Sequence, residues 1–520
     1  MNILGKNILG NSSSSEGTVG IQALNPATGE TLGPLFYKAT LSELETAVQK
    51  AISAFDTYKN TSGQQKATFL EAIATEIEQL GDTLLNRYMA ESGLPAGRAA
   101  GERGRTMGQL RMFANLIREG SWVNATIDPA LPDRQPLARP DLRSMERALG
   151  PVAVFGASNF PLAFSVAGGD TAAALASGCP VVFKAHPSHL GTSDLVGQAI
   201  QKAAQDTGMP DGVFSMLYDD GIEIGQALVK HPSIRAVAFT GSYRGGKAIF
   251  DTAMQRPEPI PVYAEMGSTN PVFILPETAQ AQAESLAQNY LGSVTMGVGQ
   301  FCTNPGMLFY QTNPAFKALL IQKTAAAASG VMLNSGIKLA YDKGISHLSK
   351  QASVLAKGAS PESKNAAQPI IFHVPYEQFA ANPDLSEEVF GPSSVVIETT
   401  SKEELLAAAR NLKGHLTATV IGSEAELALY SDLIDILSQK VGRLLFNGFP
   451  TGVEVSHAMV HGGPFPATTD ARSTSVGTQA ITRFTRPVCF QDMPNSLLPP
   501  ALKHDNPEGI WRKIDGLLQK

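Results

Sequence analysis

The middle of the chain alternates short apolar runs with helical patterns. Residues 151–156, Pro-Val-Ala-Val-Phe-Gly, have the length and apolar character of a buried strand, and a helix-compatible stretch through Ala176 follows. Three more apolar runs and two helical patterns repeat this form, at 180–184, 213–218 and 234–240 and at 192–204 and 225–230. Short buried strands alternating with helices are typical of a parallel, doubly wound sheet. Ligands bind such sheets at the carboxyl ends of the strands, so the residues after each strand are candidates for a site.

A second series of the same kind fills the C-terminal half. Its apolar runs and helical patterns lie at 307–310, 416–421 and 443–446 and at 315–328, 402–412 and 424–437. At 520 residues the chain is too long for one hydrophobic core, so two or three domains are expected. The two series predict an α/β protein with two doubly wound parallel-sheet domains.

Helical patterns dominate the N-terminal third. Ser42 with Glu45 has the spacing of a capping box at the start of the first helix. Helical patterns then cover 64–80 and continue to about Arg118. We interpret these helices as packing elements and assign no chemistry to them. The polar residues 11–15 predict a flexible lead-in before them.

The segment from Asp128 to Arg147 differs from its surroundings. It carries four prolines with charged residues between them, which excludes a compact helix: Pro129, Pro132, Pro136 and Pro140. We interpret it as an extended arm that leaves the first domain. Together with the C-terminal tail, such an arm favours a homo-oligomer, most simply a twofold dimer.

The composition excludes several classes of function. Hydrophobic residues make up 43% and charged residues 17% of the chain, and the net charge is −6 without a cluster of basic residues. Nucleic acid is therefore not expected as a partner. No apolar run approaches the roughly 20 residues of a membrane span. Three scattered cysteines, Cys179, Cys302 and Cys489, predict a reducing compartment, the cytoplasm, instead of a disulfide framework.

One of these cysteines lies in a segment suited to chemistry. Cys302 follows two glycines and precedes Thr303, Asn304 and Pro305 in the segment Val294 to Gly306. Glycines let the backbone approach a ligand, and a proline fixes the following turn. A nucleophilic thiolate would fit there; the alternative is a structural cysteine packed as a small hydrophobic residue.

Three polar residues follow predicted strands. The Asn159 amide is positioned to donate to an oxyanion, or it serves as a turn or helix cap. The Lys184 ammonium ends the next strand, where it meets a ribose or phosphate group or is simply solvated. Glu265 lies between apolar pieces that would raise its pKa enough for a general base, or it is a paired buried acid.

Two further segments complete the candidates. Thr240 to Lys247 contains Gly241, Ser242 and Gly246 between a strand and a helix, where small residues expose backbone donors to an anion. This turn is not the Gly-x-Gly-x-x-Gly fingerprint. Glu388 stands in a charged turn that would otherwise be called solvated surface. No pair or cluster with the spacing of metal ligands is evident, so no metal is expected.

Taken in order, these segments resemble the NAD(P)-dependent aldehyde dehydrogenase superfamily over nearly the full chain, from the turn at 25–30 to the C-terminal region. The features that carry the resemblance at these separations are Asn159, Lys184, Gly241-Ser242, Glu265, Cys302 and Glu387-Glu388-x-Phe390-Gly391-Pro392. The resemblance implies a cofactor-binding domain, a catalytic domain and a bridging arm with a C-terminal tail. Their ranges are 1–127 with 149–266, then 267–470, then 128–148 with 471–520.

The resemblance also implies a catalytic division of labour. Cys302 attacks the aldehyde carbon, and Asn159 with the Cys302 backbone N–H holds the oxyanion. Oxidation by the nicotinamide leaves a thioester, and Glu265 activates the water that hydrolyses it.

The cofactor residues follow from the same resemblance. The resemblance alone implies that Lys184 and Glu388 bind the two riboses and that Phe390 lies beside the nicotinamide. It also places three residues of one turn near the pyrophosphate: Gly241, Ser242 and Gly246. Pro187 replaces a carboxylate common in NAD-specific members, which favours NADP. Asp219 and Asp220 after the next strand act against a 2′-phosphate, so both NADP and NAD stay open.

Two segments, 156–164 and 461–466, resemble those of the 2-oxoglutarate semialdehyde (2,5-dioxovalerate) dehydrogenases. The resemblance implies a small-molecule aldehyde as substrate and a pocket that includes Phe164, His457 and Phe465. Ser158 replaces the usual Trp and opens one side of that pocket. The alternatives are a medium- or long-chain fatty aldehyde dehydrogenase, and a catalytically silent binding or structural protein with this fold.

Overall fold

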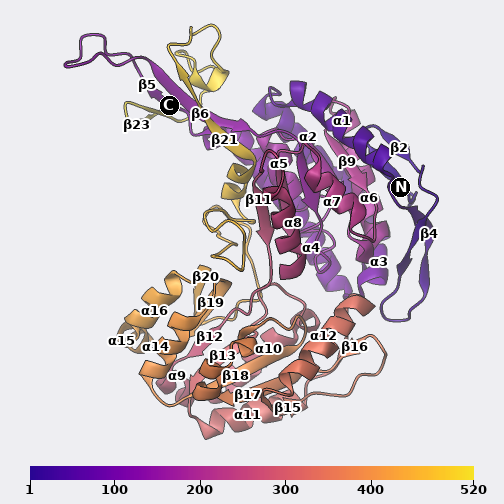
Figure 1. The fold of residues 1–520 in the computed structure, drawn as a ribbon, viewed down its shortest axis with the longest axis vertical. Coiled ribbons are helices and arrows are strands. Elements are labelled where there is room, and N and C mark those ends of the chain that lie inside the picture. The colour runs from indigo at the N-terminus through magenta and orange to yellow at the C-terminus, as the bar shows by residue number, and fades with distance from the viewer.

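The computed structural model describes residues 1–520 as two α/β lobes with a projecting β-structured arm (Figure 1). Each lobe is built on a seven-stranded sheet, and the arm carries a five-stranded sheet. The first sheet has the order β11-β10-β7-β8-β9-β1-β2, and the second has the order β15-β17-β18-β13-β12-β19-β20. The predicted fold class, α/β with two largely parallel sheets, is confirmed.

The first sheet contains five parallel strands, of which the apolar runs predict the first four. They are β7 (Val152–Phe155), β8 (Val181–Lys184), β9 (Phe214–Leu217), β10 (Ala236–Thr240) and β11 (Val262–Glu265). From β7 the chain proceeds through β8 to β9 on one side, and then returns to place β10 and β11 on the other. The reversal of strand order lies between β7 and β10, the position at which doubly wound sheets bind ligands.

The prediction of a flexible lead-in at 11–15 is wrong. Strands β1 (Asn7–Leu9) and β2 (Ser12–Ser14) form a hairpin that adds two antiparallel strands beyond β9. The buried Asn7 side chain accepts from the backbone N–H of Tyr218 at 2.8 Å, and Lys50 donates to the Leu9 carbonyl at 2.9 Å. Partners this distant in sequence hold three-residue strands that carry no periodic signal of their own. A second hairpin, β3 (Gly20–Leu24) with β4 (Thr31–Tyr37), encloses the predicted turn.

Helices cover this sheet on both faces. They are α1 (Leu41–Tyr58), α2 (Gly63–Gln79), α3 (Gly81–Ser92), α4 (Ala96–Glu119), α5 (Gly169–Ser177), α6 (Leu190–Asp206), α7 (Glu223–Lys230) and α8 (Tyr243–Met254). The capping box of α1 uses Thr40 and Glu43, not Ser42 and Glu45. The same spacing occurs twice within six residues. The buried Glu43 decides between them, because its carboxylate also accepts from the side chain of Asn7.

The second lobe follows the same plan. Its sheet consists of β12 (Val272–Ile274), β13 (Met307–Gln311), β15 (Ser353–Lys357), β17 (Ile370–Pro375), β18 (Ser393–Thr399), β19 (His415–Ile421) and β20 (Val441–Phe446), with a small pair β14 (Gly330–Val331) and β16 (Ala366–Ala367). Its helices are α9 (Pro276–Ala281), α10 (Ala283–Thr295), α11 (Pro314–Ala325), α12 (Ser335–Leu348), α13 (Tyr376–Ala381), α14 (Lys402–Asn411), α15 (Glu424–Leu429) and α16 (Ser431–Ser438). The single helix expected over 424–437 is two helices, divided at Tyr430.

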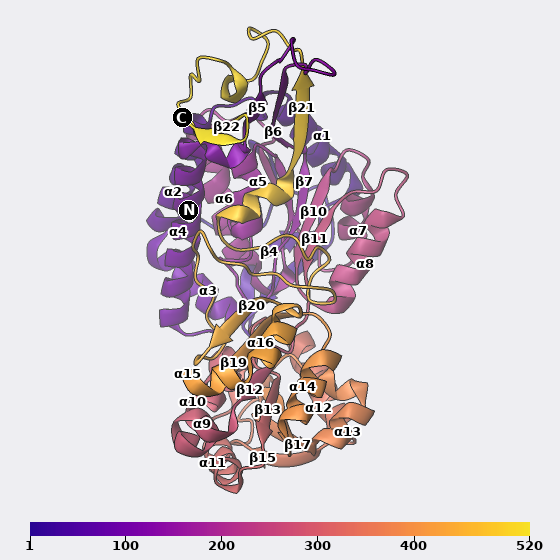
Figure 2. The same ribbon diagram turned by 90° about the vertical axis from the view of Figure 1, so that its left-hand side faces the viewer.

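The two sheets meet end to end. Strand β11 runs toward the second lobe, and β12 begins after the short crossing of residues 266–271 (Figure 2). The carboxyl ends of the first parallel sheet therefore face the amino ends of the second. Residues 447–484 return past this junction, where the Met266 N–H donates to the Ala467 carbonyl at 2.8 Å. Residues of both lobes can therefore contribute to one site at this junction.

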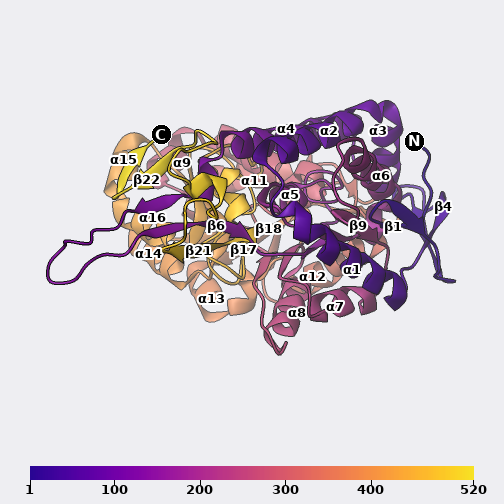
Figure 3. The same cartoon turned by 90° about the horizontal axis from the view of Figure 1, so that it is seen from above.

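The arm combines distant parts of the chain. It contains β5 (Thr126–Asp128), β6 (Leu142–Ala148), β21 (Thr485–Gln491), β22 (Arg512–Ile514) and β23 (Leu517–Gln519), and β6 pairs with β21 over its whole length. The proline-rich loop 129–141 reaches furthest from the lobes (Figure 3). Its Leu137 side chain is 74% exposed. The domain boundaries and the role of this arm in assembly stay predictions. No helix has the length and apolar character required to cross a membrane.

Candidate active site

Cys302 lies in a loop at the amino edge of the second sheet, just before β13. Asn270 donates to the carbonyl oxygens of Cys302 at 2.8 Å and Asn304 at 2.9 Å, and so holds the loop from below. Asn304 in turn donates to the carbonyls of Gly299 at 2.8 Å and Gly391 at 3.0 Å. Two buried amides therefore fix the backbone on both sides of the sulfur. The expectation that site residues lie just after the strands therefore holds for the first sheet, whereas in the second sheet Cys302 lies just before a strand.

The residues leading into this loop adopt an uncommon backbone conformation. Gly297, Val298 and Gly299 have φ values of 55°, 59° and 66°. For a β-branched residue such as Val298 a positive φ is strained, at a cost of about 1–3 kcal/mol, and such strain concentrates at functional sites. A Cβ at Gly299 would collide with the Gly391 carbonyl. The sequence requires glycine there for both reasons.

The sulfur of Cys302 belongs to a three-residue cluster. The His461 Nε2 atom lies 3.5 Å from Cys302 Sγ and 3.0 Å from Glu265 Oε1. The other carboxylate oxygen of Glu265 accepts a hydrogen bond from Ser475 at 2.7 Å. The side chains of His461 and Glu265 are almost fully buried, while Cys302 is partly accessible. One ring nitrogen thus reaches both the thiol and the acid.

The electrostatics of this cluster correct one expectation. Burial favours a raised pKa for the Glu265 carboxyl, but the neighbouring His461 ring and the Ser475 hydroxyl outweigh it and leave the pKa lowered. The expected raised pKa of Glu265 is therefore wrong. Burial, followed by the charge of Glu265, raises the pKa of the Cys302 thiol well above its usual range. The thiol needs a proton acceptor, and the acid is a carboxylate at neutral pH.

Asn159 stands beside the same loop. It follows β7, is 9% exposed, and uses its amide nitrogen to donate to the Gln300 carbonyl at 3.1 Å, two residues before the cysteine. An amide nitrogen carries two hydrogens, so a second donor is left. No hydrogen bond uses the backbone N–H of Cys302. Two donors are thus available for a developing negative charge near the sulfur.

The predicted cofactor residues border the junction between the lobes. Lys184 ends β8, and burial lowers the pKa of its ammonium group against the opposing charge of Asp219 and Asp220. Ser242 caps the N-terminus of α8 by accepting from Gly245 at 3.2 Å, and this first turn is exposed. These groups surround the reversal of strand order between β7 and β10.

The residues around this crevice fit a nicotinamide dinucleotide. Asp219 is 4% exposed, and its Oδ2 atom has no hydrogen-bond partner, although it is a strong acceptor at the end of β9. A ribose hydroxyl is a group that would satisfy it. From the second lobe, Glu388 and Phe390 line a neighbouring cleft with Ser268 and Thr269. Gly246 packs against Met266 and Phe239, below the exposed turn, and a Cβ there would collide with the Met266 side chain.

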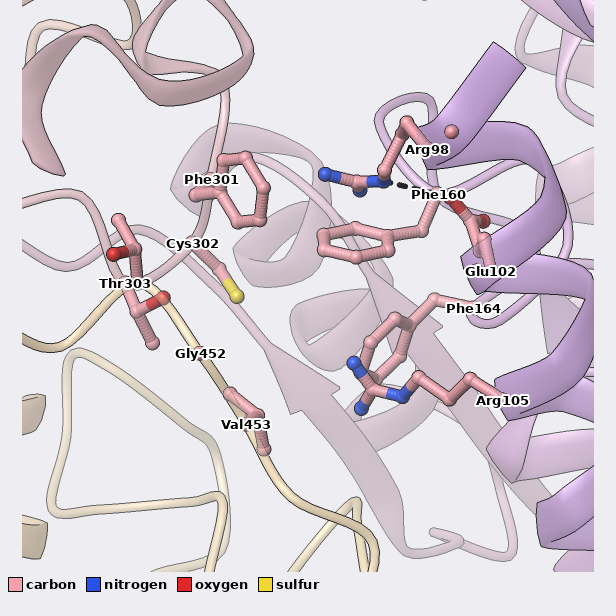
Figure 4. Close-up of a pocket in the computed structure, with 13 residues that line it drawn as sticks. Arg98, Glu102, Arg105, Phe160, Phe164, Phe301, Cys302, Thr303, Gly452 and Val453 are labelled. Carbon is pink, nitrogen blue, oxygen red and sulfur yellow. Dashed lines mark hydrogen bonds and ion pairs between the residues drawn. The ribbon is translucent and has the colours of Figure 1, made fainter. Parts of the chain in front are cut away.

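A cavity of about 240 Å³ opens in front of the sulfur (Figure 4). Cys302, Phe164, Phe160, Phe301 and Val453 are among its lining residues. Of the three predicted pocket residues, only Phe164 lies in this lining. Phe465 packs on Tyr243 near α8, with ring centroids 6.1 Å apart, and the exposed His457 also lies outside the lining.

Three residues of this site are not among those that the sequence predicts. His461 belongs to the segment 461–466, whose sequence supports the family resemblance, but only the three-dimensional structure places it next to Cys302. Arg98 and Arg105 lie on α4, which was interpreted as a packing helix only, and both line the cavity. Their separation of seven residues places them on one face of a helix, and this was the available signal.

Comparisons with known proteins agree with this arrangement. The model of the aldehyde dehydrogenase family matches residues 12–485. Alpha-ketoglutaric semialdehyde dehydrogenase of Acinetobacter baylyi is 50% identical over 504 residues, 96% of this chain and 95% of its own. Alpha-ketoglutaric semialdehyde dehydrogenase 2 of Azospirillum brasilense is 48% identical over 522 residues, 99% of each chain.

Solved structures support the fold. A gamma-glutamyl-gamma-aminobutyraldehyde dehydrogenase from Burkholderia cenocepacia superposes with a TM-score of 0.81 at 22% identity, covering 94% of this chain and 97% of that one. A 1-pyrroline-5-carboxylate dehydrogenase from Thermus with bound NAD gives 0.79 at 21% identity, covering 94% and 92%. At these identities the likeness shows the fold alone.

Proposed function

Because the chain belongs to the aldehyde dehydrogenase family, we propose that it oxidises 2-oxoglutarate semialdehyde to 2-oxoglutarate. As a member it is an oxidoreductase that acts on an aldehyde group and uses NAD or NADP. Two relatives about half identical to it carry the name of this activity. The observation that carries the proposal is that one ring nitrogen of His461 contacts both Cys302 and Glu265, behind the cavity that Cys302 lines.

The first step is attack by the Cys302 sulfur on the aldehyde carbon. Its raised pKa makes spontaneous ionisation at neutral pH rare, so the thiol proton must pass to a neighbour as the C–S bond forms. His461 and Glu265 together hold this proton as a buried imidazolium–carboxylate pair. The negative charge then resides on the former aldehyde oxygen, where the Asn159 amide and the Cys302 N–H stabilise it.

Oxidation of this adduct gives a thioester on Cys302. When bound, the nicotinamide cofactor supplies the two-electron oxidant for this step. The residues that would hold it are Lys184, Gly241 and Ser242 from the first lobe and Glu388 and Phe390 from the second. The stored proton then leaves the His461–Glu265 pair to solvent.

Hydrolysis completes the cycle. Glu265 removes a proton from water, the hydroxide adds to the thioester carbon, and the C–S bond breaks. The acid leaves, and the sulfur regains a proton from the Glu265–His461 pair. The lowered pKa of Glu265 keeps it in the basic form across the neutral range.

Cofactor preference follows from the residues after β8 and β9. Pro187 presents no carboxylate to a 2′-phosphate, which supports use of NADP. The unpartnered Oδ2 of Asp219 supports NAD, because it accepts a hydrogen bond from a 2′-hydroxyl and repels a phosphate. We propose that the chain accepts both cofactors and that Asp219 sets their ratio.

The remaining assignments concern organisation. The proposed cofactor-binding domain is 1–127 with 149–266, and the catalytic domain is 267–470. The arm, 128–148 with 471–520, is proposed to join two copies in a homodimer, because its protruding loop carries the exposed Leu137. Size-exclusion chromatography with light scattering of the full chain and of a variant lacking 130–138 tests this.

The activity is tested with a substrate panel. Reduced cofactor is followed with 2-oxoglutarate semialdehyde, pentanal and decanal, each with NAD and with NADP. We expect the highest kcat/KM for the semialdehyde. A higher value for decanal would replace this proposal with a fatty aldehyde dehydrogenase, which the aromatic lining of the cavity would then explain.

A further inference from the structure

The cavity wall contains a charged group without a partner. Arg105 projects from α4 into the space between Phe164 and Val453, opposite Cys302 (Figure 4). Its Nε and Nη2 atoms are shielded from solvent and have no hydrogen-bond partner, and no acid forms an ion pair with it. Guanidinium donors left without an acceptor are energetically costly, so such a group needs an explanation. A bound anion would supply one.

The nearest acid on the helix does not neutralise Arg105. Glu102 is 4% exposed, and its two oxygens already accept four hydrogen bonds. The donors are the backbone N–H groups of Leu162 and Ala163, the Tyr88 hydroxyl and the Arg98 guanidinium. Arg98 is therefore held by Glu102, and Arg105 is left free. The two arginines line the same cavity, but only Arg98 has an acidic partner.

The surroundings of Arg105 strengthen its pull on an anion. Its guanidinium carbon lies 5.2 Å from the ring centroid of Phe164 and 6.0 Å from that of Phe160. These rings exclude water, which strengthens electrostatic attraction inside the cavity. Arg443, from β20, adds a second positive charge near Arg105. Its side chain donates to the carbonyl of Gly452, a residue of the cavity lining, at 2.8 Å.

Helix α4 also leaves room beside Arg105. Gly97 and Gly101 line the cavity, and glycine is unfavourable inside a helix. A Cβ at either position would meet nothing within 4 Å, so packing does not require glycine there. Their missing side chains widen the approach to the wall that carries Arg98 and Arg105. Open space next to an unpaired guanidinium is the arrangement of an anion subsite.

We propose that Arg105 binds the carboxylate of the substrate and so makes the enzyme selective for aldehydes that carry a carboxylate at the other end of a short chain. This inference rests on the proposed function and deepens it. A guanidinium fork matches a carboxylate with two parallel hydrogen bonds. With its carboxylate on Arg105, a semialdehyde directs its other end toward Cys302, across the same cavity. A neutral aldehyde forms no such pair of hydrogen bonds with Arg105 and is affected by it only through the weaker pull of the Arg105 charge on the Cys302 thiol.

The test compares two aldehydes of equal chain length on matched variants. Arg105→Met removes the charge and keeps an apolar side chain of similar length. We expect kcat/KM for 2-oxoglutarate semialdehyde to fall about 100-fold, mainly through KM, and kcat/KM for pentanal to change less than about threefold. Arg103→Met is the control, because Arg103 on the same helix donates to the Gly81 carbonyl and does not line the cavity.

A second readout does not depend on turnover. Glutarate, a dicarboxylate of the same chain length, should protect Cys302 from alkylation by iodoacetamide in the wild type and Arg103→Met but not in Arg105→Met. Arg105→Lys, which keeps the charge and loses the fork, should give partial protection and an intermediate KM. Folding of each variant is checked by its melting temperature.

The outcomes separate the two proposals. A wild type that turns over pentanal as well as the semialdehyde overturns the proposed substrate, whereas glutarate protection through Arg105 would still support the anion subsite. Equal losses for both aldehydes in a folded Arg105→Met, or unchanged protection by glutarate, would overturn the role of Arg105. The substrate assignment would then stand on the wild-type preference alone.

Discussion

The role of His461 gives the sharpest prediction of the mechanism. Replacing it with glutamine keeps an amide that can donate to Glu265, but the amide cannot take up the thiol proton. A lost general base costs about 100- to 10,000-fold in rate, and 100-fold corresponds to about 2.7 kcal/mol. We expect His461→Gln to lower kcat and the rate of Cys302 alkylation at pH 7 by at least the smaller factor.

The structure also predicts what His461→Gln does to the pH profile. Loss of the imidazole leaves the Glu265 carboxylate beside the thiol without a ring that can take up a proton, which raises the pKa of Cys302 further. The alkylation rate, measured with iodoacetamide from pH 6 to 10 without cofactor, should therefore rise at higher pH than in the wild type. His461→Ala would remove the ring partner of a buried carboxylate outright, at about 3–5 kcal/mol, so glutamine is the informative change.

The control is Ser475→Ala. Ser475 contacts Glu265 at 2.7 Å but does not contact the sulfur, so this variant disturbs the same acid without touching the proposed proton path. It should keep most of the alkylation rate and the wild-type profile. If His461→Gln and the wild type are alkylated at the same rate across the pH range, His461 does not accept the thiol proton.

The remaining predictions concern the rest of the site. Asn159→Ala should lower kcat about 100- to 1000-fold with the rate of Cys302 alkylation unchanged; a small loss of kcat would remove the amide from the oxyanion site. Asp219→Asn should raise the NADP-to-NAD ratio of kcat/KM, and a constant ratio would argue against Asp219 as its determinant. Zn²⁺ should inhibit, with relief by chelator, because the ligand atoms of Cys302, His461 and Glu265 lie within 4.8 Å of one another. His461→Gln should weaken this inhibition, and equal sensitivity would place the metal elsewhere.

The fold was predictable where the signal is local and strong. Four buried apolar runs between helical patterns predict four of the five parallel strands of the first sheet, and these strands, β7 to β10, lie within two residues of the expected positions. The N-terminal hairpin β1–β2 was not predictable, because its strands depend on pairing with β9 and on the Asn7 side chain. Strands β15, β17 and β18 were also missed, although the helices around them were partly found.

The site shows where sequence reasoning ends. The spacing of known motifs identifies Cys302, Glu265 and Asn159, but the lowered pKa of Glu265 depends on His461, 196 residues away in the chain. The charge at the cavity wall comes from Arg105, on a helix whose sequence predicts only packing. A missing hydrogen-bond partner is a property of three-dimensional structure and leaves no trace in a single sequence.

The central claim is that Cys302 carries the substrate as a covalent acyl group. Its most direct test uses Glu265→Gln, in which attack and oxidation proceed on Cys302 but hydrolysis is slow. The variant is mixed with 2-oxoglutarate semialdehyde and NAD or NADP, quenched, digested and mapped by mass spectrometry. The account predicts that the peptide with Cys302 gains the mass of one 2-oxoglutaryl group, in step with a single turnover of reduced cofactor. Reduced cofactor formed with an unmodified Cys302, or with the acyl group on Cys179 or Cys489, would contradict it.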